Sequence, residues 1–268
     1  KKQKGGIFLH KIRNKGTGKL KNFIKACVPA LILLILWQLA FLSGKWSAYV
    51  LPGPEKVWKS FVTMTGNGTL LKHVLVSFKR VLTGFSISFV CAFCLGMIAA
   101  LKKDLEVYYG PYVEFMRNVP PISLIALLIL WFGIGETSKI IIIVLASFFP
   151  MFMHIRKGLL SCDKKLLEVG KTCGLSKTAC FFKVRLPWAF PDILVGMRIG
   201  LGYSWRAIIG AEIAAGKGLG YLILDAQQMS RSDKVIVGIF VIGLVGLLCD
   251  KAFLWIIRKW VRGGVENS

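Results

Sequence analysis

The stretch Val81–Leu101 reads VLTGFSISFVCAFCLGMIAAL and carries no charged side chain. A helix needs about 20 mainly apolar residues to cross the hydrocarbon core of a bilayer, and this stretch is long enough. Backbone N–H and C=O groups cannot stay unpaired in lipid, so a spanning stretch in such a chain has to be helical. The stretch therefore predicts a transmembrane helix and an α-helical membrane protein.

Five further stretches have the same character, because they are uncharged or carry only a few ionisable groups. The composition agrees, since 55% of the 268 residues are hydrophobic, only 18% are charged and the mean hydropathy is +0.62. We therefore expect an all-α polytopic transmembrane bundle with about six spans, at residues 26–43, 81–101, 119–135, 139–156, 193–213 and 235–257. This predicts a transmembrane domain at 26–260, preceded by a basic segment at 1–25 and followed by a tail at 261–268.

Basic residues are distributed unevenly between these spans. The net charge is +23, and segment 1–25 contains nine Lys/Arg residues and no acid. Segment 156–185 contains eight, whereas the loops on the other side contain few. The positive-inside rule then places both termini and the loop 163–187 in the cytoplasm. Because the basic residues flank spans and form no patch interleaved with aromatic residues, we exclude nucleic-acid binding. The basic N-terminus also resembles a signal peptide, but 26–43 is long and lacks a clear cleavage site, so we interpret it as a retained span.

Patterns for enzymatic chemistry are missing. A phosphate-binding loop needs G-x-x-x-x-G-K-[ST], and the nearest match, Gly210 with Gly216–Gly218, has the wrong spacing and no hydroxyl. The histidines His10, His73 and His154 are scattered and suggest no metal site. We therefore expect a chain that is not an enzyme and binds no metal or cofactor of its own.

The cytoplasmic loop 163–187 predicts two short helices outside the membrane. Asp163 is a suitable N-cap, and Gly174 suits the left-handed residue that ends a helix. Ser176 can cap a second helix, which we expect to stop before Pro187.

The first of these helices has an apolar stripe formed by Leu166, Val169, Gly170 and Cys173. Such a helix suits a groove on a partner protein. The alternative is a helix that rests on lipid headgroups.

The pattern Glu168-x5-Gly174-x9-Val184-x-Leu186-Pro187 resembles the EAA loop of the membrane-spanning (permease) subunits of ABC importers. In that family the loop forms the coupling helix, which docks on a cytoplasmic ATPase. Val169 and Gly170 replace the two alanines of the family, and glycine weakens a helix by up to about 1 kcal/mol. The resemblance implies ATPase-coupling roles for Asp163, Leu166, Glu168, Gly170, Gly174, Leu186 and Pro187.

The resemblance covers nearly the whole chain after the basic N-terminus. The segments that carry it are 51–54, 117–121, 131–136, 211–212 and 218–220, and they are similar to the branch that imports nitrate, taurine and aliphatic sulfonates. That branch also includes carriers for pyrimidine precursors of thiamine. The resemblance implies a bacterial-type cell membrane protein that forms a homodimer with a second copy. It also implies two ABC ATPase subunits, which hold ATP and magnesium, and an extracytoplasmic substrate-binding protein.

The predicted span 193–213 has two different faces. Gly196, Gly200 and Ser204 form a small-x-x-x-small stripe, which lets helices approach closely.

The other face carries charged and aromatic side chains, and charges inside a span normally face a cavity or a partner. We therefore predict a translocation pathway that includes Arg198, Trp205, Arg206, Glu212 and, near the third span, Asn118. Arg198 has the alternative of reaching the headgroups, and Asp250 and Lys251 are expected to be anchors at the membrane surface. Pro120 and Pro121 are interpreted as a helix start, with a break that lines a cavity as the alternative.

These patterns favour a permease subunit that forms the pathway for a small anionic organic or inorganic solute, driven by a separate ATPase. One alternative is a permease for a thiamine precursor or another small aromatic nutrient. The other is a secondary transporter or channel that works alone. The span charges are arginines rather than the acidic residues or histidines used for ion coupling, which weighs against a secondary transporter.

Overall fold

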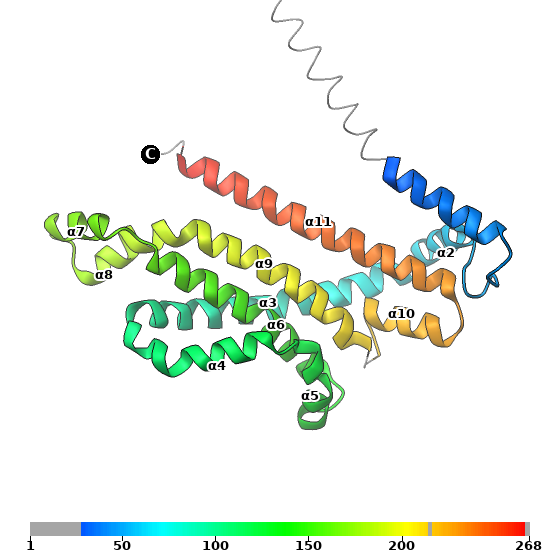
Figure 1. Ribbon diagram of the computed structural model, residues 1–268, viewed down its shortest axis with the longest axis horizontal. Helices are drawn as coiled ribbons and strands as arrows, with labels where there is room; N and C mark the ends of the chain where they lie inside the picture. The colour runs from blue at the N-terminus through cyan, green and yellow to red at the C-terminus, as the bar shows by residue number, and fades with distance from the viewer. Residues whose placement is uncertain (1–27, 214–215, 266–268) are drawn as a thin grey trace, which may run out of the picture.

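The computed structural model describes residues 28–213 and 216–265, and that part of the chain contains helices and no strand. The long helices run roughly along one axis, with α7 and α8 at one end and α2 and α10 at the other (Figure 1). An apolar helix at Val28–Leu42 precedes the labelled elements. These are α2 (Pro54–Gly66), α3 (Thr69–Leu101), α4 (Glu106–Asn118), α5 (Ile125–Phe132), α6 (Glu136–Leu160), α7 (Lys164–Thr172), α8 (Lys177–Cys180), α9 (Leu186–Ile213), α10 (Leu219–Gln228) and α11 (Ser232–Val265). The all-α prediction is confirmed, and the basic segment 1–25 lies outside the described residues.

Three helices are long and apolar enough to cross a membrane: α3, α6 and the Ser232–Lys259 part of α11. A bent pair, α4 with residues 121–132, makes a fourth candidate if it counts as one span. By this measure the described chain has three or four candidate spans rather than the predicted six. Val28–Leu42 is a shorter apolar helix, and α9 has 28 residues but is not among the helices that meet this measure.

Residues 119–135, predicted as one span, contain a 3-10 turn and the short helix α5, and they follow a break after α4. Helix α4 ends at Asn118, a 3-10 turn begins at Pro121, and α5 starts only at Ile125. The two halves of the pair are bent by 89°. Pro120 and Pro121 have no N–H to donate to the preceding turn, so α4 cannot continue through them. The two prolines therefore begin a new helix, as expected, and the chain turns sharply at this point.

Helix α3 begins twelve residues before the predicted span, at Thr69 rather than at residue 81. Residues 69–80, which include polar side chains and were predicted to lie in a loop, therefore belong to the helix. The short helices α2 and α10 also lie in segments that were predicted to be outer loops. Hydropathy marks only the apolar part of a helix, so it misses turns whose polar side chains find partners inside the protein.

Helix α6 lies between α3 and α9, and glycines set both contacts. A Cβ at Gly84 of α3 would lie 2.7 Å from Ile143 of α6. On the other side, a Cβ at Gly196 or Gly200 of α9 would lie 2.7 Å from the side chain of His154 or Met151. The predicted small-residue stripe of α9 is thus confirmed, because it lets α9 approach α6 closely.

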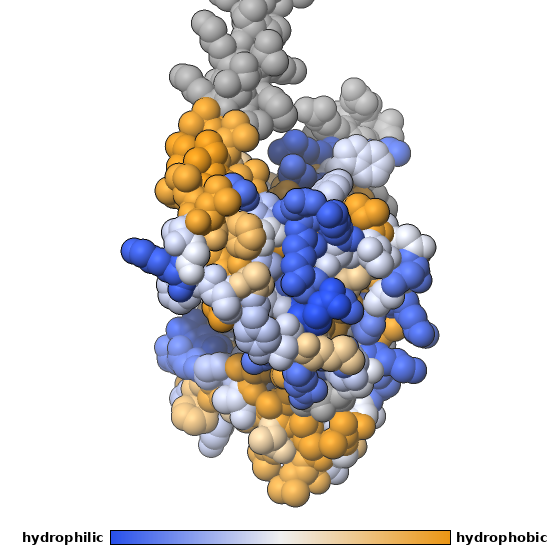
Figure 2. All heavy atoms as spheres, turned by 90° about the vertical axis from the view of Figure 1, so that its right-hand side faces the viewer, coloured by the Kyte–Doolittle hydropathy of each residue, from blue (hydrophilic) through white to orange (hydrophobic). Residues whose placement is uncertain are grey.

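The end of the molecule that carries α2 and α10 has a polar centre. Figure 2 shows hydrophilic residues gathered in the middle of this view, with hydrophobic residues above and below them. Many large apolar side chains elsewhere are exposed, including most of those in Val28–Leu42. A surface with so much exposed apolar area is typical of a protein whose sides face lipid or another subunit.

Candidate functional site

Helix α7 begins and ends at the residues that the sequence predicts. Asp163 Oδ1 accepts the N–H of Lys165 at 2.9 Å, which caps the first turn. Gly174 has φ +77°, in the left-handed region. The N–H of Leu175 donates to Gly170 O at 3.1 Å, and the N–H of Gly174 donates to Lys171 O at 2.9 Å. These two bonds form a Schellman motif, which explains why this turn needs a glycine.

Gly170 is buried where α7 meets the next segment. A Cβ at this position would lie 3.2 Å from Cys180 Sγ and 3.6 Å from Leu175 and Val184. The glycine that replaces the alanine of the family pattern therefore lets α7 and α8 pack closely. Ser176 Oγ accepts the N–H of Ala179 at 3.2 Å, so the predicted second cap is also present.

The prediction that the second helix stops before Pro187 is wrong. Helix α8 continues into a π-helical turn at Phe181–Arg185, and α9 follows directly from Leu186. Pro187 therefore lies in the first turn of α9, where a missing N–H is tolerated. The loop 163–187 consequently joins α9 without a flexible break.

The exposed side of α7 carries both apolar and acidic groups. Leu166 is 40% exposed and Val169 is 58% exposed, and Glu168 is exposed beside them. Helices α7 and α8 lie together at one end of the molecule (Figure 1). The structure thus forms the helix and exposes Leu166 and Val169 of the apolar stripe, while Gly170 packs inwards. The docking of an ATPase on this helix stays a prediction.

The predicted pathway residues of α9 have very different surroundings. Arg198 is exposed and forms a two-pronged ion pair with Asp250 of α11, at 2.7 and 2.8 Å. Asp250 is therefore the partner of Arg198 rather than a free surface anchor. Trp205 is buried between α9 and α11, where its indole N–H donates to Ile242 O at 3.1 Å.

Arg206 is exposed and has no carboxylate partner among the described residues. Its Nε–H donates to Gly202 O at 3.1 Å, one turn earlier in the same helix. Its guanidinium lies 4.9 Å from the centre of the Tyr203 ring. Asn118, at the end of α4, is also exposed, and its Nδ2–H donates to Glu114 O at 2.7 Å.

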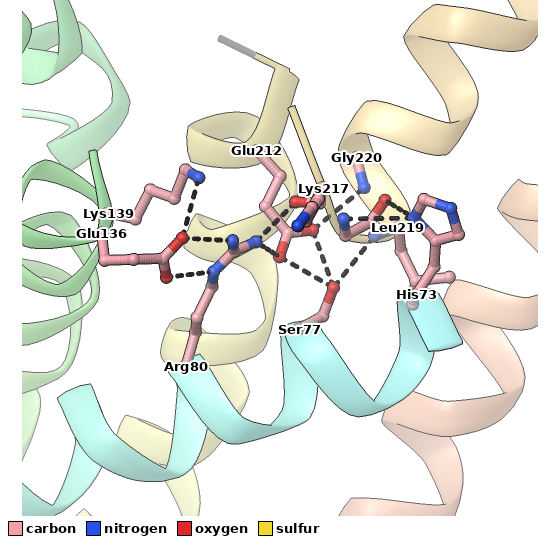
Figure 3. A network of polar contacts seen from close by, with 10 residues as sticks. His73, Ser77, Arg80, Glu136, Lys139, Glu212, Lys217, Leu219 and Gly220 are labelled. Carbon is pink, nitrogen blue, oxygen red and sulfur yellow. Dashed lines mark hydrogen bonds and ion pairs between the residues drawn. The ribbon is translucent and has the colours of Figure 1, made fainter. Parts of the chain in front are cut away.

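Glu212 is fully buried, at 0% exposure, and belongs to a polar network that joins three helices (Figure 3). Arg80 of α3 donates to Glu212 Oε1 at 2.8 Å and to Glu136 of α6 at 2.6 Å. Ser77 Oγ lies 2.7 Å from Glu212 Oε2. Buried Lys139 completes the network, 3.4 Å from Glu136. Two cations thus balance two carboxylates, which is how buried charges are tolerated. Within this chain Glu212 therefore points into the helix bundle and not towards an open pathway.

The first turn of α10, with Gly218 before it, closes over this network. The N–H of Gly220 donates to Glu212 Oε2 at 3.1 Å, and the N–H of Leu219 donates to Ser77 Oγ at 2.9 Å. Gly218 has φ +115°, and a Cβ there would lie 2.1 Å from the Glu212 carboxylate. A Cβ at Gly220 would lie 2.1 Å from a backbone oxygen of α9. The Gly-Leu-Gly segment therefore allows the backbone to reach the buried carboxylate.

Sequence reasoning missed Arg80, His73 and Ser77, because it started the span after them. His73 Nδ1 lies 2.8 Å from Gly218 O. Residues 73, 77 and 80 recur at helical spacing and share one face of α3. This helical spacing of polar residues, directly before the apolar run 81–101, could have indicated that the helix begins earlier than the apolar run.

The sequence matches a known family over residues 92–262, the "Binding-protein-dependent transport system inner membrane component". The chain belongs to this family. It is an inner membrane, multi-pass permease of an ABC transporter and not itself the ATPase. The family implies partners that hydrolyse ATP and a substrate-binding protein.

Relatives of this permease are similar along most of their length. It is 33% identical over 252 residues to an aliphatic sulfonates transport permease protein, SsuC, of Bacillus subtilis, covering 94% of this chain and 91% of the relative. It is 34% identical over 249 residues to the taurine transport system permease protein TauC of Escherichia coli, covering 90% of both. It is 29% identical over 260 residues to the bicarbonate transport system permease protein CmpB of Synechococcus elongatus, covering 92% of both.

The fold of the permease is similar to that of solved ABC transporters. A crystal structure of an amino acid ABC transporter with histidines matches with a TM-score of 0.61 and 16% identity, covering 74% of this chain and 98% of that one. The MetNI methionine ABC transporter, in an inward facing conformation, matches with a TM-score of 0.52 and 17% identity, covering 69% and 94%. At these identities the likeness concerns the fold alone.

Proposed function

We propose that this permease forms the pathway for a small anionic solute of the sulfonate, taurine or nitrate type. It works as a homodimer with two ATPase subunits and an extracytoplasmic binding protein. The observation that carries the solute class is Arg206, an exposed arginine on a helix of the bundle with no acidic partner in the described chain. The names of the relatives add support, since sulfonates, taurine and bicarbonate all carry an anionic group.

Arg206 differs from Arg80 and Arg198, which also lie on helices of the bundle. Arg80 is neutralised by two carboxylates and Arg198 by Asp250. A cation at membrane depth costs about 2.5–3.5 kcal/mol on insertion scales unless it meets water, a partner or a ligand. An arginine fork also matches the paired oxygens of a carboxylate or a sulfonate. Arg206 is therefore the residue that favours an anion in a water-filled pathway.

The coupling of transport to ATP hydrolysis is assigned to the loop 163–187. Its support is the capped helix α7, the glycine turn at Gly174 and the apolar side chains of Leu166 and Val169, which face outwards at one end of the molecule. The rigid connection of this loop to α9 gives a route by which a docked ATPase moves the helix that carries Arg206. In this arrangement both termini and the loop lie in the cytoplasm.

The test is uptake into liposomes that contain the complete transporter with its binding protein. We expect ATP-driven uptake of taurine or a short alkanesulfonate, and no uptake of a neutral aromatic solute. Arg206→Gln should lower uptake at least tenfold while complex assembly and basal ATP hydrolysis survive, and Arg206→Lys should retain part of the activity because it keeps the charge. Uptake of the neutral aromatic solute alone would refute the anion assignment, and unchanged uptake by Arg206→Gln would remove Arg206 from the pathway.

A further inference from the structure

A groove of about 320 Å³ lies between α9 and α11, and Arg206 is part of its wall. Its volume is at the lower end of the range for pockets that hold small ligands. Most of the wall is apolar and comes from both helices, with Leu201, Trp205, Ile242 and Leu247 as its largest apolar side chains. The groove therefore suits a small solute that has an apolar part.

Arg206 is the cation at one end of this groove, and part of its guanidinium is free. Its Nε–H donates to Gly202 O at 3.1 Å, but neither Nη group has an acceptor among the described residues. A Cβ at Gly202 would lie 3.4 Å from Arg206 Nη2, so the guanidinium lies against a residue of the groove wall. The guanidinium has donors and no acceptor. A solute that carries an anionic oxygen group therefore finds its partner at this end of the groove.

An ion pair closes the other end of the groove. Arg198 and Asp250 both line it, and they bind each other at 2.7 and 2.8 Å, so Arg198 is not available to an anion. Arg198 and Arg206 are eight positions apart in α9, which places them about 12 Å apart along the helix. This length is shorter than one leaflet of a hydrocarbon core about 30 Å thick. The groove thus fits a small solute better than the acyl chain of a lipid.

Two glycines of α11 shape the middle of the groove. A Cβ at Gly246 would lie 2.8 Å from Trp205 Nε1, so this glycine lets the indole pack against α11, where its N–H donates to Ile242 O. Gly243 also lies in the wall, but a Cβ there would meet nothing within 4 Å. The space beside Gly243 is therefore part of the groove, and a larger side chain at this position would enter it.

We infer that this groove selects the transported solute by its apolar tail: the oxyanion group binds Arg206, and an alkyl chain lies along the apolar wall between α9 and α11. The inference rests on the proposed function, which concerns the anionic group alone. The solute class is an alkanesulfonate with a chain of several carbons rather than nitrate or bicarbonate, because those two ions have no apolar part. The sulfonate oxygens accept from the arginine fork. Burial of each further methylene should favour binding about fourfold, until the chain reaches the ion pair at the other end.

The test compares initial rates of ATP-driven uptake of hexane-1-sulfonate and methanesulfonate, both at low concentration, into liposomes that contain the complete transporter. The binding protein is the same throughout, so a change in the ratio of the two rates comes from the permease. Gly243→Leu fills the groove and should lower the ratio of hexane-1-sulfonate to methanesulfonate uptake by about tenfold or more, as expected when two or more methylenes lose their buried site. Gly66→Leu is the matched control, because a Cβ at Gly66 of α2 also meets nothing within 4 Å and Gly66 does not line the groove. Its ratio should equal that of the wild type.

A second pair of variants removes part of the wall instead of filling the space. Leu247 lines the groove and is 50% exposed, whereas its neighbour Leu248 is 55% exposed and does not line it. Leu247→Ala should lower the same uptake ratio several-fold, because the alkyl chain loses an apolar contact, and Leu248→Ala should leave the ratio unchanged. Alanine favours the helix at both positions, so this pair decides the question if Gly243→Leu does not assemble.

Equal ratios for Gly243→Leu and Gly66→Leu, or for Leu247→Ala and Leu248→Ala, would overturn the inference. If Gly243→Leu lowers uptake of both sulfonates equally and light scattering shows separated permease copies, a second copy of the chain occupies the groove. An equal loss in an intact complex would leave the groove to a lipid, and either result rejects the solute as its occupant. In all these cases sulfonate uptake by the wild type leaves the proposed function standing. If the wild-type transporter takes up no sulfonate, the proposed function fails and this inference fails with it.

Discussion

Replacement of Glu212 by glutamine tests whether the buried network holds α3, α6 and α9 together. The glutamine has nearly the same volume but loses the negative charge and one acceptor atom. At present the Glu212 carboxylate accepts from Arg80 at 2.8 Å, from Ser77 at 2.7 Å and from the N–H of Gly220 at 3.1 Å. Whichever way the amide is turned, its NH₂ group faces at least one of these donors.

The expected loss of stability depends on the partners that Arg80 keeps after the replacement. Removal of one partner of a buried ion pair costs about 3–5 kcal/mol, because the other charge stays buried. Here Arg80 keeps Glu136, whose side chain is 60% exposed, so the loss is partly offset. We therefore expect Glu212→Gln to lower the free energy of unfolding by about 2–4 kcal/mol. For a chain of this size this corresponds to a fall of roughly 5–15 °C in the midpoint of thermal unfolding.

The assay is thermal unfolding of the purified permease in detergent, read as the loss of monodisperse protein. Glu55→Gln is the matched control, since Glu55 forms an exposed ion pair with Lys59 one helical turn away, and it should leave the midpoint unchanged. A double-mutant cycle of Glu212→Gln with Ser77→Ala should show coupling, because the two side chains share hydrogen bonds. A midpoint for Glu212→Gln equal to that of Glu55→Gln would refute the idea that this network stabilises the bundle.

The remaining predictions concern the coupling loop and the helix contacts. Gly174→Val forces a β-branched residue into a left-handed turn, so substrate-driven ATP hydrolysis should be lost while membrane insertion survives; full hydrolysis in the reconstituted complex would contradict the coupling assignment. Cys173 is exposed, whereas Cys162 is buried and its burial raises the pKa of its thiol. A maleimide should therefore label Cys173 first, and only from the cytoplasmic side, and labelling from outside would invert the proposed topology. Gly200→Val overpacks the contact of α9 with α6 and should cost about 1–3 kcal/mol, whereas Gly202→Val, which has more space, should cost less in the same unfolding assay.

Local features of the sequence predicted the loop 163–187 well. The caps at Asp163 and Ser176 and the turn at Gly174 depend on backbone geometry within a few residues, so the residue types alone indicate them. The continuation through Pro187 was missed, because the π-helical turn that leads into α9 lies against α7, with Val184 beside Gly170, and the sequence does not show that contact. The apolar stripe of α7 was visible in the sequence, but its partner is another chain and remains a prediction.

The amino-acid pattern was enough to predict the helical membrane class, the close-packing stripe at Gly196 and Gly200, and the family. Each of these depends on composition, on spacing or on motifs along the chain. The charges of the spans were distinguished only by the three-dimensional contacts. Arg206 has no carboxylate partner among the described residues, whereas Arg198 pairs with Asp250 and Glu212 is buried. The physical reason is distance along the chain: Arg80 and Glu212 are separated by 132 positions. Hydropathy scores each residue on its own surroundings in sequence, whereas the stability of a buried charge depends on the partner that folding brings to it.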